Sequence, residues 1–360
     1  MKIYKINFYH LKSGIVIVII QADDGTEGIG QFIGNSFKSQ INYYENNLRK
    51  ILINKNINLK EIWDQMYWNG LGKNGWIQVI AAIDIALHDL IAKKKEKPLF
   101  KLFKSKNNNV KMYWSIGHGF EKTIKEMQKK IDIGLNKGFK AFKIRMDWHE
   151  LRQNVDPQKD FKMLKAVRLM LPTDYYLGFD ANGGYSVETA INQGKKFEDL
   201  GGISHFEEPI STNDLFGLKK VAKSLKIPIS FGEYEKTASR FKEIIELANP
   251  DIIQPDILNI GGISQLIELC KLSKKYKKKI MPHSPNIGIL SFASLHFYSL
   301  YGSNLPHEFS PELYNYRMSN HARLFNENIL PKDGHIMLNN NFGIGLTINK
   351  KELKKQTINK

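Results

Sequence analysis

Six ionisable side chains in the second half of the 360-residue chain occur at nearly equal intervals, with gaps of 27, 26, 23, 27 and 25 residues. Each stands at the end of a short apolar run, as Asp180 does in YYLGFD and His283 does in KIMPH. Carboxylates and imidazoles are the groups that bind metal ions and transfer protons. The six residues are Asp180, Glu207, Glu233, Asp256, His283 and Glu308.

This interval predicts the repeated unit of a (β/α) barrel, because a strand, a helix and two short loops take about 25 residues. The carboxyl ends of the strands in such a barrel meet at one mouth, so residues far apart in sequence come together there. From Lys111 onward we predict eight strands, beginning with KMYWSIG and GFKAFKIRM, and a helical pattern follows each strand but the last. The first two helices are predicted over 121–137 and 157–171.

Asp180, Glu207 and Glu233 end three successive predicted strands and should lie side by side at the mouth. One strand-end carboxylate alone is often a helix cap or a loop anchor. Three strand-end carboxylates in register, with no basic run beside them, favour a metal site. Three oxygen donors without a cysteine suit Mg²⁺, with waters and a substrate carboxylate as its further ligands.

Asp256 and His283 end the next two strands, and a carboxylate beside an imidazole fixes its tautomer and raises its basicity. The pair predicts an acid–base group beside the metal, although a histidine in His-Ser-Pro can also be a structural turn residue. Glu308 ends the eighth strand and could accept a hydrogen bond or, when protonated, donate one to a developing oxyanion. Alternation along the strand lets only one of Glu308 and His307 face the mouth.

Lys143 and Arg145 lie two residues apart on the second predicted strand, so their side chains point to the same side. We expect both cations to face a substrate carboxylate or enolate across from the metal, with ion pairs to core carboxylates as the alternative. Asn182 follows Asp180 by two residues, and it could bind a substrate oxygen or form an Asx-turn.

The first 110 residues have a different pattern. Strands are predicted over 1–30, where SGIVIVIIQA is a nearly continuous β-branched run, and helices over 38–104. We therefore predict an α+β domain over 1–110, the barrel over 111–325, and a C-terminal segment over 326–360 that packs back on the first domain. The stretches 31–37 and 68–76 are rich in Gly, Asn and aromatic residues, which favours lid loops, with ordinary turns as the alternative.

The net charge of +17 would suit a nucleic-acid partner, but the lysine clusters at 93–95, 274–279 and 350–355 are scattered, and no recognition motif accompanies them. We therefore expect no nucleic-acid partner. Cys270 is the only cysteine, which excludes a disulfide framework and makes a reducing cytoplasm the simplest location. The start MKIYKINFYH lacks a signal-peptide layout and GIVIVII is too short to span a bilayer, so no membrane partner is expected.

Taken together, these motifs resemble the enolase superfamily, in particular the mandelate racemase-like subgroup of the mandelate racemase/muconate lactonizing enzyme family. The resemblance covers nearly the whole chain and rests on AAIDIALHDLIAKKKEKPLFKLF and the strand ends FDANGGY, HFEEP, FGE, PDILNIGGIS, PHS and HEF. It implies an α/β fold: a modified TIM barrel with an N-terminal α+β capping domain that the C-terminal tail completes. It also implies Mg²⁺ ligands at Asp180, Glu207 and Glu233 and a dyad of His283 and Asp256.

The implied activity is removal of the proton α to the carboxylate of a small acid by His283, with Glu308 stabilising the enolate and Lys143 and Arg145 neutralising it. Many members of the subgroup have Lys-x-Lys where this chain has Lys143 and Arg145, and an always-protonated arginine is a poor proton acceptor. With one competent base, we predict a homo-oligomeric lyase that dehydrates an aldonate or aldarate to a 2-keto-3-deoxy acid. The alternatives are a racemase or epimerase of a 2-hydroxy acid, and a protein that binds an anionic ligand or nucleic acid on an enzyme scaffold.

Overall fold

The computed structural model of the protein describes residues 1–70, 76–105, 107–117, 123–146, 153–301, 304–313 and 320–358. Its first part is an antiparallel sheet with the order β1 (Ile3–His10), β2 (Ile15–Ala22), β3 (Glu27–Ile33). The central strand β2 is buried along nearly its whole length, in agreement with its β-branched run. The helices that follow are α1 (Phe37–Tyr43), the π-helical η1 (Tyr44–Leu48), α2 (Arg49–Leu52), α3 (Leu59–Gly70), α4 (Ile77–Lys94) and α5 (Leu99–Leu102).

Helix α4 packs directly on strand β3, and two glycines of β3 allow this close contact. A Cβ atom at Gly28 would lie 2.1 Å from the carbonyl oxygen of Ala86, and one at Gly30 would lie 2.0 Å from that of Ala82. Any larger residue would therefore push the helix away from the sheet. The sequence EGIG of β3 therefore also forms the surface that holds α4.

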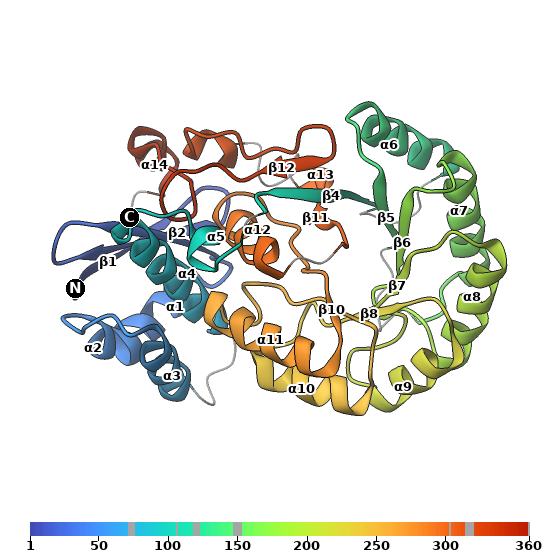
Figure 1. Ribbon diagram of the computed structural model, residues 1–360, viewed down its shortest axis with the longest axis horizontal. Helices are drawn as coiled ribbons and strands as arrows, with labels where there is room; N and C mark the ends of the chain where they lie inside the picture. Colours follow the sequence, from blue (N-terminus) through green and yellow to red (C-terminus); the bar gives the residue numbers. More distant parts are fainter. Residues whose placement is uncertain are drawn as a thin grey trace.

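The second part is the predicted barrel, visible in Figure 1 as a curved sheet inside a ring of helices. Among the described residues, eight parallel strands are hydrogen-bonded in the order β10-β9-β8-β7-β6-β5-β4-β11. They are β4 (Asn109–Ile116), β5 (Ala141–Arg145), β6 (Tyr176–Asp180), β7 (His205–Glu207), β8 (Ile229–Phe231), β9 (Ile252–Ile253), β10 (Lys279–Ile280) and β11 (His307–Phe309).

The helices between these strands cover the outside of the sheet, as the helical patterns predicted (Figure 1). They are α6 (Ile124–Asn136), α7 (Pro157–Met170), α8 (Val187–Leu200), α9 (Leu215–Ser224), α10 (Thr237–Leu247), α11 (Ile263–Tyr276) and α12 (Ile289–Tyr301). Directly after β11 the described chain forms the short α13 (Pro311–Leu313) and the 3-10 turn η4 (His321–Leu324).

The barrel departs from the prediction in its later strands. In the described part of the chain, β10 and β11 share no ladder of hydrogen bonds, so the ring is open there. Three strands end two or three residues before the ionisable residue, at Phe231, Ile253 and Ile280. Gly232 turns the chain with a φ of +119°, and Pro255 and Pro282 have no N–H to continue a ladder. Asp256 and His283 nevertheless meet through an isolated parallel bridge.

The C-terminal segment first contacts the barrel and then the N-terminal sheet. Strand β12 (His335–Met337) pairs antiparallel with the first residues of β4. The pairing is possible because β4 begins well before Trp114, its first residue paired with β5. The last helix, α14 (Lys350–Gln356), brings Ile358 beside β1, where its amide donates to the carbonyl of His10 at 2.8 Å. Both chain ends therefore lie at this sheet (Figure 1).

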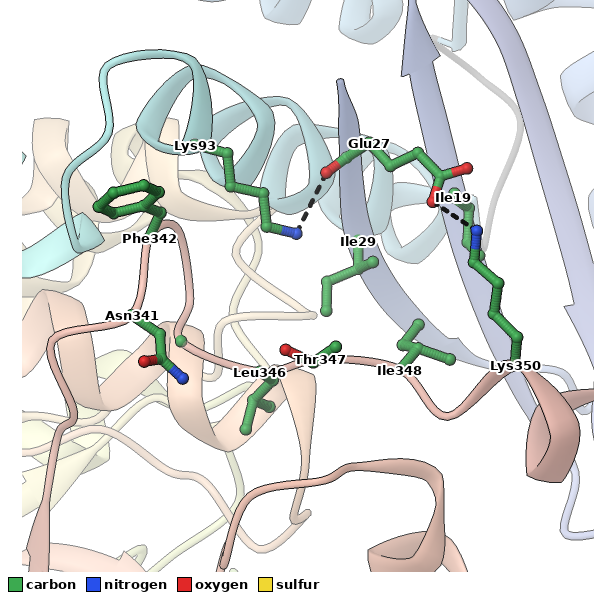
Figure 2. A pocket seen from close by; sticks show the side chains of 11 residues that line it. Ile19, Glu27, Ile29, Lys93, Asn341, Phe342, Leu346, Thr347, Ile348 and Lys350 are labelled. Atoms are coloured by element: carbon green, nitrogen blue, oxygen red, sulfur yellow. Dashed lines mark hydrogen bonds and ion pairs between the residues drawn. The ribbon is translucent and has the colours of Figure 1, made fainter. Parts of the chain in front are cut away.

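A pocket of about 370 Å³ lies at the junction of the N-terminal sheet and the C-terminal segment. Figure 2 shows the side chains that line it. Ile29 of the sheet and Ile348 of the segment are among the apolar residues that line it. Its charged groups are paired, because Lys93 donates to the carbonyl of Glu27 at 3.1 Å and Lys350 lies 3.3 Å from the Glu27 carboxylate. These contacts attach the end of the chain to the first domain.

The N-terminal part also packs against the loops at the barrel mouth. Trp63 of α3 donates a hydrogen bond to the carbonyl of Gly261 at 2.7 Å, and Gln31 of β3 accepts one from the amide of Ile289 at 3.2 Å. Residues 31–33 of the predicted lid therefore belong to a buried strand end, because Gln31 and Phe32 are inaccessible. In the other predicted lid, 68–76, residues 71–75 lie outside the described residues. Within the described ranges, no helix combines the length and apolar character needed to cross a bilayer.

Candidate active site

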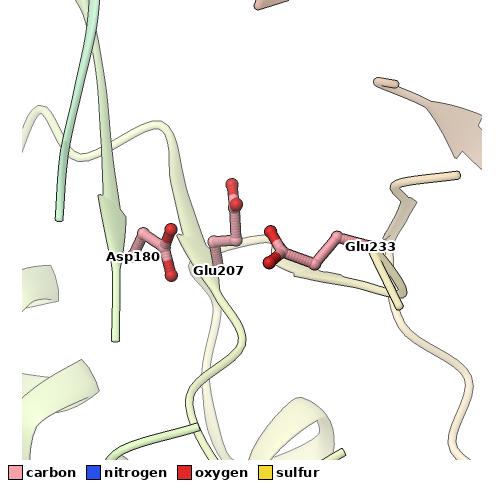
Figure 3. A group of neighbouring side chains, drawn as sticks. All are labelled: Asp180, Glu207 and Glu233. Carbon is pink, nitrogen blue, oxygen red and sulfur yellow. The ribbon is translucent and has the colours of Figure 1, made fainter. Parts of the chain in front are cut away.

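Three carboxylates converge at the mouth of the barrel (Figure 3). Asp180 and Glu207 are the last residues of β6 and β7, and Glu233 lies two residues beyond β8. One oxygen of each carboxylate lies within 4.8 Å of the others. The side chains are buried, so the barrel gathers the three residues that were predicted to bind a metal.

This acidic group has the properties of a cation site. Burial and the nearby charge of Glu207 raise the pKa of Asp180 to about 7, because like charges out of water destabilise one another. Among the described residues, no hydrogen bond reaches Asp180 Oδ2 or Glu233 Oε2, although both atoms are buried. A set of carboxylate oxygens alone fits a hard divalent cation such as Mg²⁺.

Lys143 lies among these carboxylates. Its Nζ is 2.5 Å from Glu207 Oε1, 3.4 Å from Asp180 Oδ2 and 3.5 Å from Glu308 Oε1. Burial would lower the pKa of Lys143, but the charges of Glu207 and Glu308 outweigh it and hold that pKa well above its usual value. The ion pairs considered as an alternative are therefore present, and Lys143 is a fixed cation.

His283 and Asp256 form the pair expected from the sequence. Nδ1 of His283 is 3.0 Å from Asp256 Oδ2, while Oδ1 accepts hydrogen bonds from the amides of Leu258 and Asn259 at 2.8 and 3.0 Å. Nε2 of His283 faces the acidic group, 3.5 Å from Glu233 Oε2. Burial acts against protonation, but the neighbouring carboxylates, Glu233 foremost, raise the pKa of His283 to about 10.

Glu308 of β11 contacts both the lysine and the histidine loop. Its Oε2 accepts a hydrogen bond from the amide of Ser284 at 2.9 Å, and Lys143 lies on its other oxygen. Burial acts to raise the pKa of Glu308, but Lys143 and His283 lower it to about 2, so the carboxyl is ionised and accepts hydrogen bonds. His307 faces the other way, with Nε2 2.9 Å from the Ser294 hydroxyl, as strand alternation predicted.

Arg145 and Asn182 bind each other at the edge of the site. Arg145 Nη2 donates to Asn182 Oδ1 at 2.5 Å, and Asn182 Nδ2 donates to the carbonyl of Met146 at 2.9 Å. The amide N–H of Asn182 donates to Asp180 Oδ1 at 2.8 Å, which is an Asx-type turn made by the aspartate. Asn182 therefore orients Arg145 and Asp180 in this structure, while its predicted contact with substrate stays a prediction.

A buried layer beneath Glu207 was missed by the sequence analysis. His205 and Gln254 are hydrogen-bonded to this carboxylate, and the hydroxyl of Tyr176 is hydrogen-bonded to His205. Two of them could have been found from strand alternation. His205 stands two residues before Glu207 and Tyr176 four before Asp180, so both side chains point to the inner face.

Glu208 is a further buried residue near the acidic group, and it was not predicted. We placed only the first glutamate of HFEEP in the site, yet Glu208 is buried as well. Burial and the charge of Glu233 hold its pKa well above the usual value. Its φ of 38° explains the placement, because the chain leaves the strand geometry at this residue and alternation no longer applies.

A parallel barrel that carries an acidic triad and a histidine–aspartate pair at its mouth defines a protein of the enolase superfamily type. Comparison with known families agrees in both parts of the chain. Residues 9–103 match the mandelate racemase / muconate lactonizing enzyme N-terminal domain, and residues 126–352 match the enolase C-terminal domain-like family. The chain therefore belongs to the mandelate racemase/muconate lactonizing enzyme family, and the predicted resemblance is confirmed.

The names of individual relatives indicate the class of reaction. The arabinonate dehydratase of Saccharolobus solfataricus is 30% identical over 344 residues, covering 93% of this chain and 88% of the relative. The L-talarate/galactarate dehydratase of Salmonella typhimurium is 28% identical, covering 93% and 80%. A mandelate racemase/muconate lactonizing protein from Paracoccus denitrificans, solved with magnesium, is 29% identical, with a TM-score of 0.90 over 99% and 98% of the chains. Both dehydratases are lyases, which is the predicted enzyme class.

Proposed function

We propose that the protein is a Mg²⁺-dependent dehydratase of acid sugars that converts an aldonate or aldarate to a 2-keto-3-deoxy acid. The observation that carries the proposal is the position of one imidazole, His283, beside the acidic group. Its Nδ1 is held by Asp256 at 3.0 Å, which leaves Nε2 toward the site. The names of the curated relatives support acid sugars as the substrate class.

Asp180, Glu207 and Glu233 would hold the metal. When bound, Mg²⁺ supplies a Lewis acid for the negative charge that develops on the substrate carboxylate. With the charge of Glu233 neutralised, the pKa of His283 falls from its raised value toward neutrality, so the imidazole can accept and return a proton.

In the proposed reaction, His283 Nε2 takes the α-proton and then gives a proton to the β-hydroxyl as its C–O bond breaks and water leaves. The resulting enol converts to the 2-keto acid. Lys143 and Arg145 would neutralise the substrate carboxylate, and Glu308 would hold Lys143 and the loop of Ser284 in place.

The environment of the two cations favours dehydration over racemisation, which needs a second base on the opposite face of the substrate. Lys143 is bonded to carboxylates that stabilise its charge, and Arg145 is a guanidinium. Both cations therefore offer fixed positive charge, and neither is a proton acceptor of neutral-range pKa.

A library of mono- and diacid sugars tests the proposal. The purified chain is incubated with each acid and Mg²⁺, the keto product is detected with semicarbazide, and a parallel reaction in D₂O is followed by NMR. A keto acid formed only with Mg²⁺ is the expected result. Solvent deuterium at the α-carbon without loss of water would identify the alternative, an epimerase or racemase, and no reaction with any acid would refute both.

The domain limits 1–110, 111–325 and 326–360, a cytoplasmic location and a homo-oligomer belong to the same proposal. Light scattering after size-exclusion chromatography measures the assembly directly. A monomer at micromolar concentration would refute the homo-oligomer without affecting the proposed chemistry.

A further inference from the structure

We infer that His205, supported by Tyr176 and Gln254, is a positioning residue of the metal site that holds the Glu207 carboxylate in the orientation needed to bind the cation. The inference rests on the metal site proposed above. It concerns side chains that neither bind the metal nor transfer protons in the proposed reaction.

The hydrogen bonds of His205 connect two neighbouring strands. Its Nε2 is 3.2 Å from Glu207 Oε2, and because a carboxylate oxygen only accepts, Nε2 carries the hydrogen. Its Nδ1 is hydrogen-bonded to the Tyr176 hydroxyl at 2.8 Å, so the ring is fixed at both nitrogens. Gln254 Nε2 donates to the same Glu207 oxygen at 2.6 Å. His205 itself has no exposed surface.

The imidazole of His205 fits inside the barrel because the neighbouring strand β6 has a glycine, Gly178, opposite it. Gly178 is the inward residue of β6 between Tyr176 and Asp180, and β6 pairs with the strand of His205. A Cβ atom at Gly178 would lie 1.9 Å from His205 Cε1. Any side chain at this position would therefore displace the imidazole, so the glycine and the histidine form one packed unit.

Glu207 differs from the other two members of the acidic group in its hydrogen bonds. Both of its oxygens have donors, Lys143 on Oε1 and His205 with Gln254 on Oε2. In contrast, no described donor reaches Asp180 Oδ2 or Glu233 Oε2 by a hydrogen bond. Glu207 is therefore the member of the group with both oxygens hydrogen-bonded, whereas these oxygens of Asp180 and Glu233 have only the longer ion-pair contacts with Lys143 at 3.4 Å and His283 at 3.5 Å.

Donors on a carboxylate have two opposite effects on metal binding. They withdraw negative charge, which weakens the attraction for a cation, and they fix the orientation of the ligand, which strengthens binding. Loss of such partners typically weakens metal affinity by about 10- to 100-fold, so orientation is the larger effect. We therefore expect removal of the His205 donor to weaken Mg²⁺ binding.

Calorimetric titration of Mg²⁺ into the EDTA-treated, dialysed full chain tests this expectation. His205→Phe keeps a ring above Gly178 but removes the donor, and its Kd should rise by about 10-fold or more. His205→Gln keeps a donor near the position of Nε2 and should restore the Kd to within about threefold of the parent. Tyr176→Phe removes a single oxygen and should give an intermediate Kd even if the larger change disturbs folding.

His296→Phe is the matched control, because His296 is equally buried but bonds to the amide of Phe100 and the carbonyl of Ile344, away from the site. It should lower the melting temperature and leave the Kd for Mg²⁺ unchanged. The inference is overturned if His205→Phe binds Mg²⁺ as tightly as the parent or tighter, or if His296→Phe weakens binding equally. A weaker Kd in a chain that dehydrates no acid sugar would support the inference and refute only the proposed function.

Discussion

Lys143 and His283 are both surrounded by carboxylates, yet their surroundings suit different tasks. The ammonium of Lys143 is buried and lies within 3.5 Å of three carboxylates, which keeps it charged. His283 has one nitrogen on Asp256 and the other directed at the acidic group, with its side chain 14% exposed. Proton transfer needs a nitrogen that substrate can reach, so at the scale of single residues the histidine is the candidate base.

We expect His283→Asn to lower turnover and α-proton exchange by about 100- to 10,000-fold, because the acid–base group is lost. Mg²⁺ affinity, measured by calorimetry, should change little. Asp180→Asn is the complementary variant and should weaken Mg²⁺ binding strongly. Full proton exchange in the His283 variant would remove this residue as the base, and unchanged metal affinity in the Asp180 variant would remove that ligand.

Lys143→Met should destabilise the metal-free protein by about 3 to 5 kcal/mol, because buried carboxylates lose their ion-pair partner. Added Mg²⁺ should raise the melting temperature of this variant more than that of the parent, since the cation replaces part of the lost charge. Thermal unfolding with EDTA and with saturating Mg²⁺ measures both effects. Equal melting temperatures of the two proteins in EDTA would contradict the assignment of Lys143 as the compensating charge.

At the scale of elements, a few buried side chains attach one segment to another. Asp89 of α4 is the clearest case, because Oδ2 accepts the amide of Ile29 at 2.9 Å and Oδ1 accepts the amide of Ile344 at 2.7 Å. Lys93 lies 2.7 Å from the same carboxylate. One aspartate thus joins a helix, the edge strand β3 and the C-terminal segment.

Asp89→Ala should lower the free energy of unfolding by about 3 kcal/mol, because two buried amides lose their acceptor and each loss costs about 1 to 3 kcal/mol. Asp24→Ala is the control, since Asp24 makes an exposed ion pair with Lys94, which should contribute much less than the buried hydrogen bonds of Asp89. Urea unfolding gives the energies, and limited proteolysis should cleave the C-terminal segment of the Asp89 variant first. Equal losses in the two variants would show that the junction is not held by Asp89.

At the scale of the whole molecule, buried neutral histidines make stability depend on pH. Burial lowers the pKa of His296 and His307 to about 4 and that of His321 to about 3. The unfolded chain takes up these protons near pH 6.5 and the folded chain does not, so acid favours unfolding. His88 and His283, whose pKa values are raised although burial opposes it, act in the opposite sense but are fewer than the histidines with a lowered pKa.

We therefore expect stability to be highest near about pH 6.5, because His283 loses its contribution at higher pH. Stability should fall between about pH 6.5 and 4, by up to about 1.4 kcal/mol per pH unit for each histidine with a lowered pKa. Glu308, with its pKa lowered to about 2, should add to the loss at the acid end. Unfolding curves at pH 8, 6 and 5 measure the slope. His296→Gln removes one titrating group and should make the slope shallower, and an unchanged slope would exclude this residue as a contributor.

Much of the architecture could be predicted because its signals are local. The regular interval of strand ends predicted the barrel, and the helical pattern over 157–171 agrees with α7 (Pro157–Met170) within one residue. The carboxyl ends of the strands in a parallel barrel meet at one mouth, so the six ionisable residues could be assigned to that mouth from the sequence. The predicted strand ends near Asp256 and His283 were less accurate, because Pro255 and Pro282 stop the ladder early.

The sequence by itself determined the repeated unit, the residue types at the mouth and the family, since all three are encoded in spacing and motif. Only the tertiary structure decided that Lys143 lies inside the acidic group, that Glu308 is ionised, and that His205 supports Glu207 from below. These properties depend on which side chains from different strands come within hydrogen-bonding distance and on how deeply each charge is buried. Neither distance nor burial is a property of a single segment, so no local pattern could have supplied them.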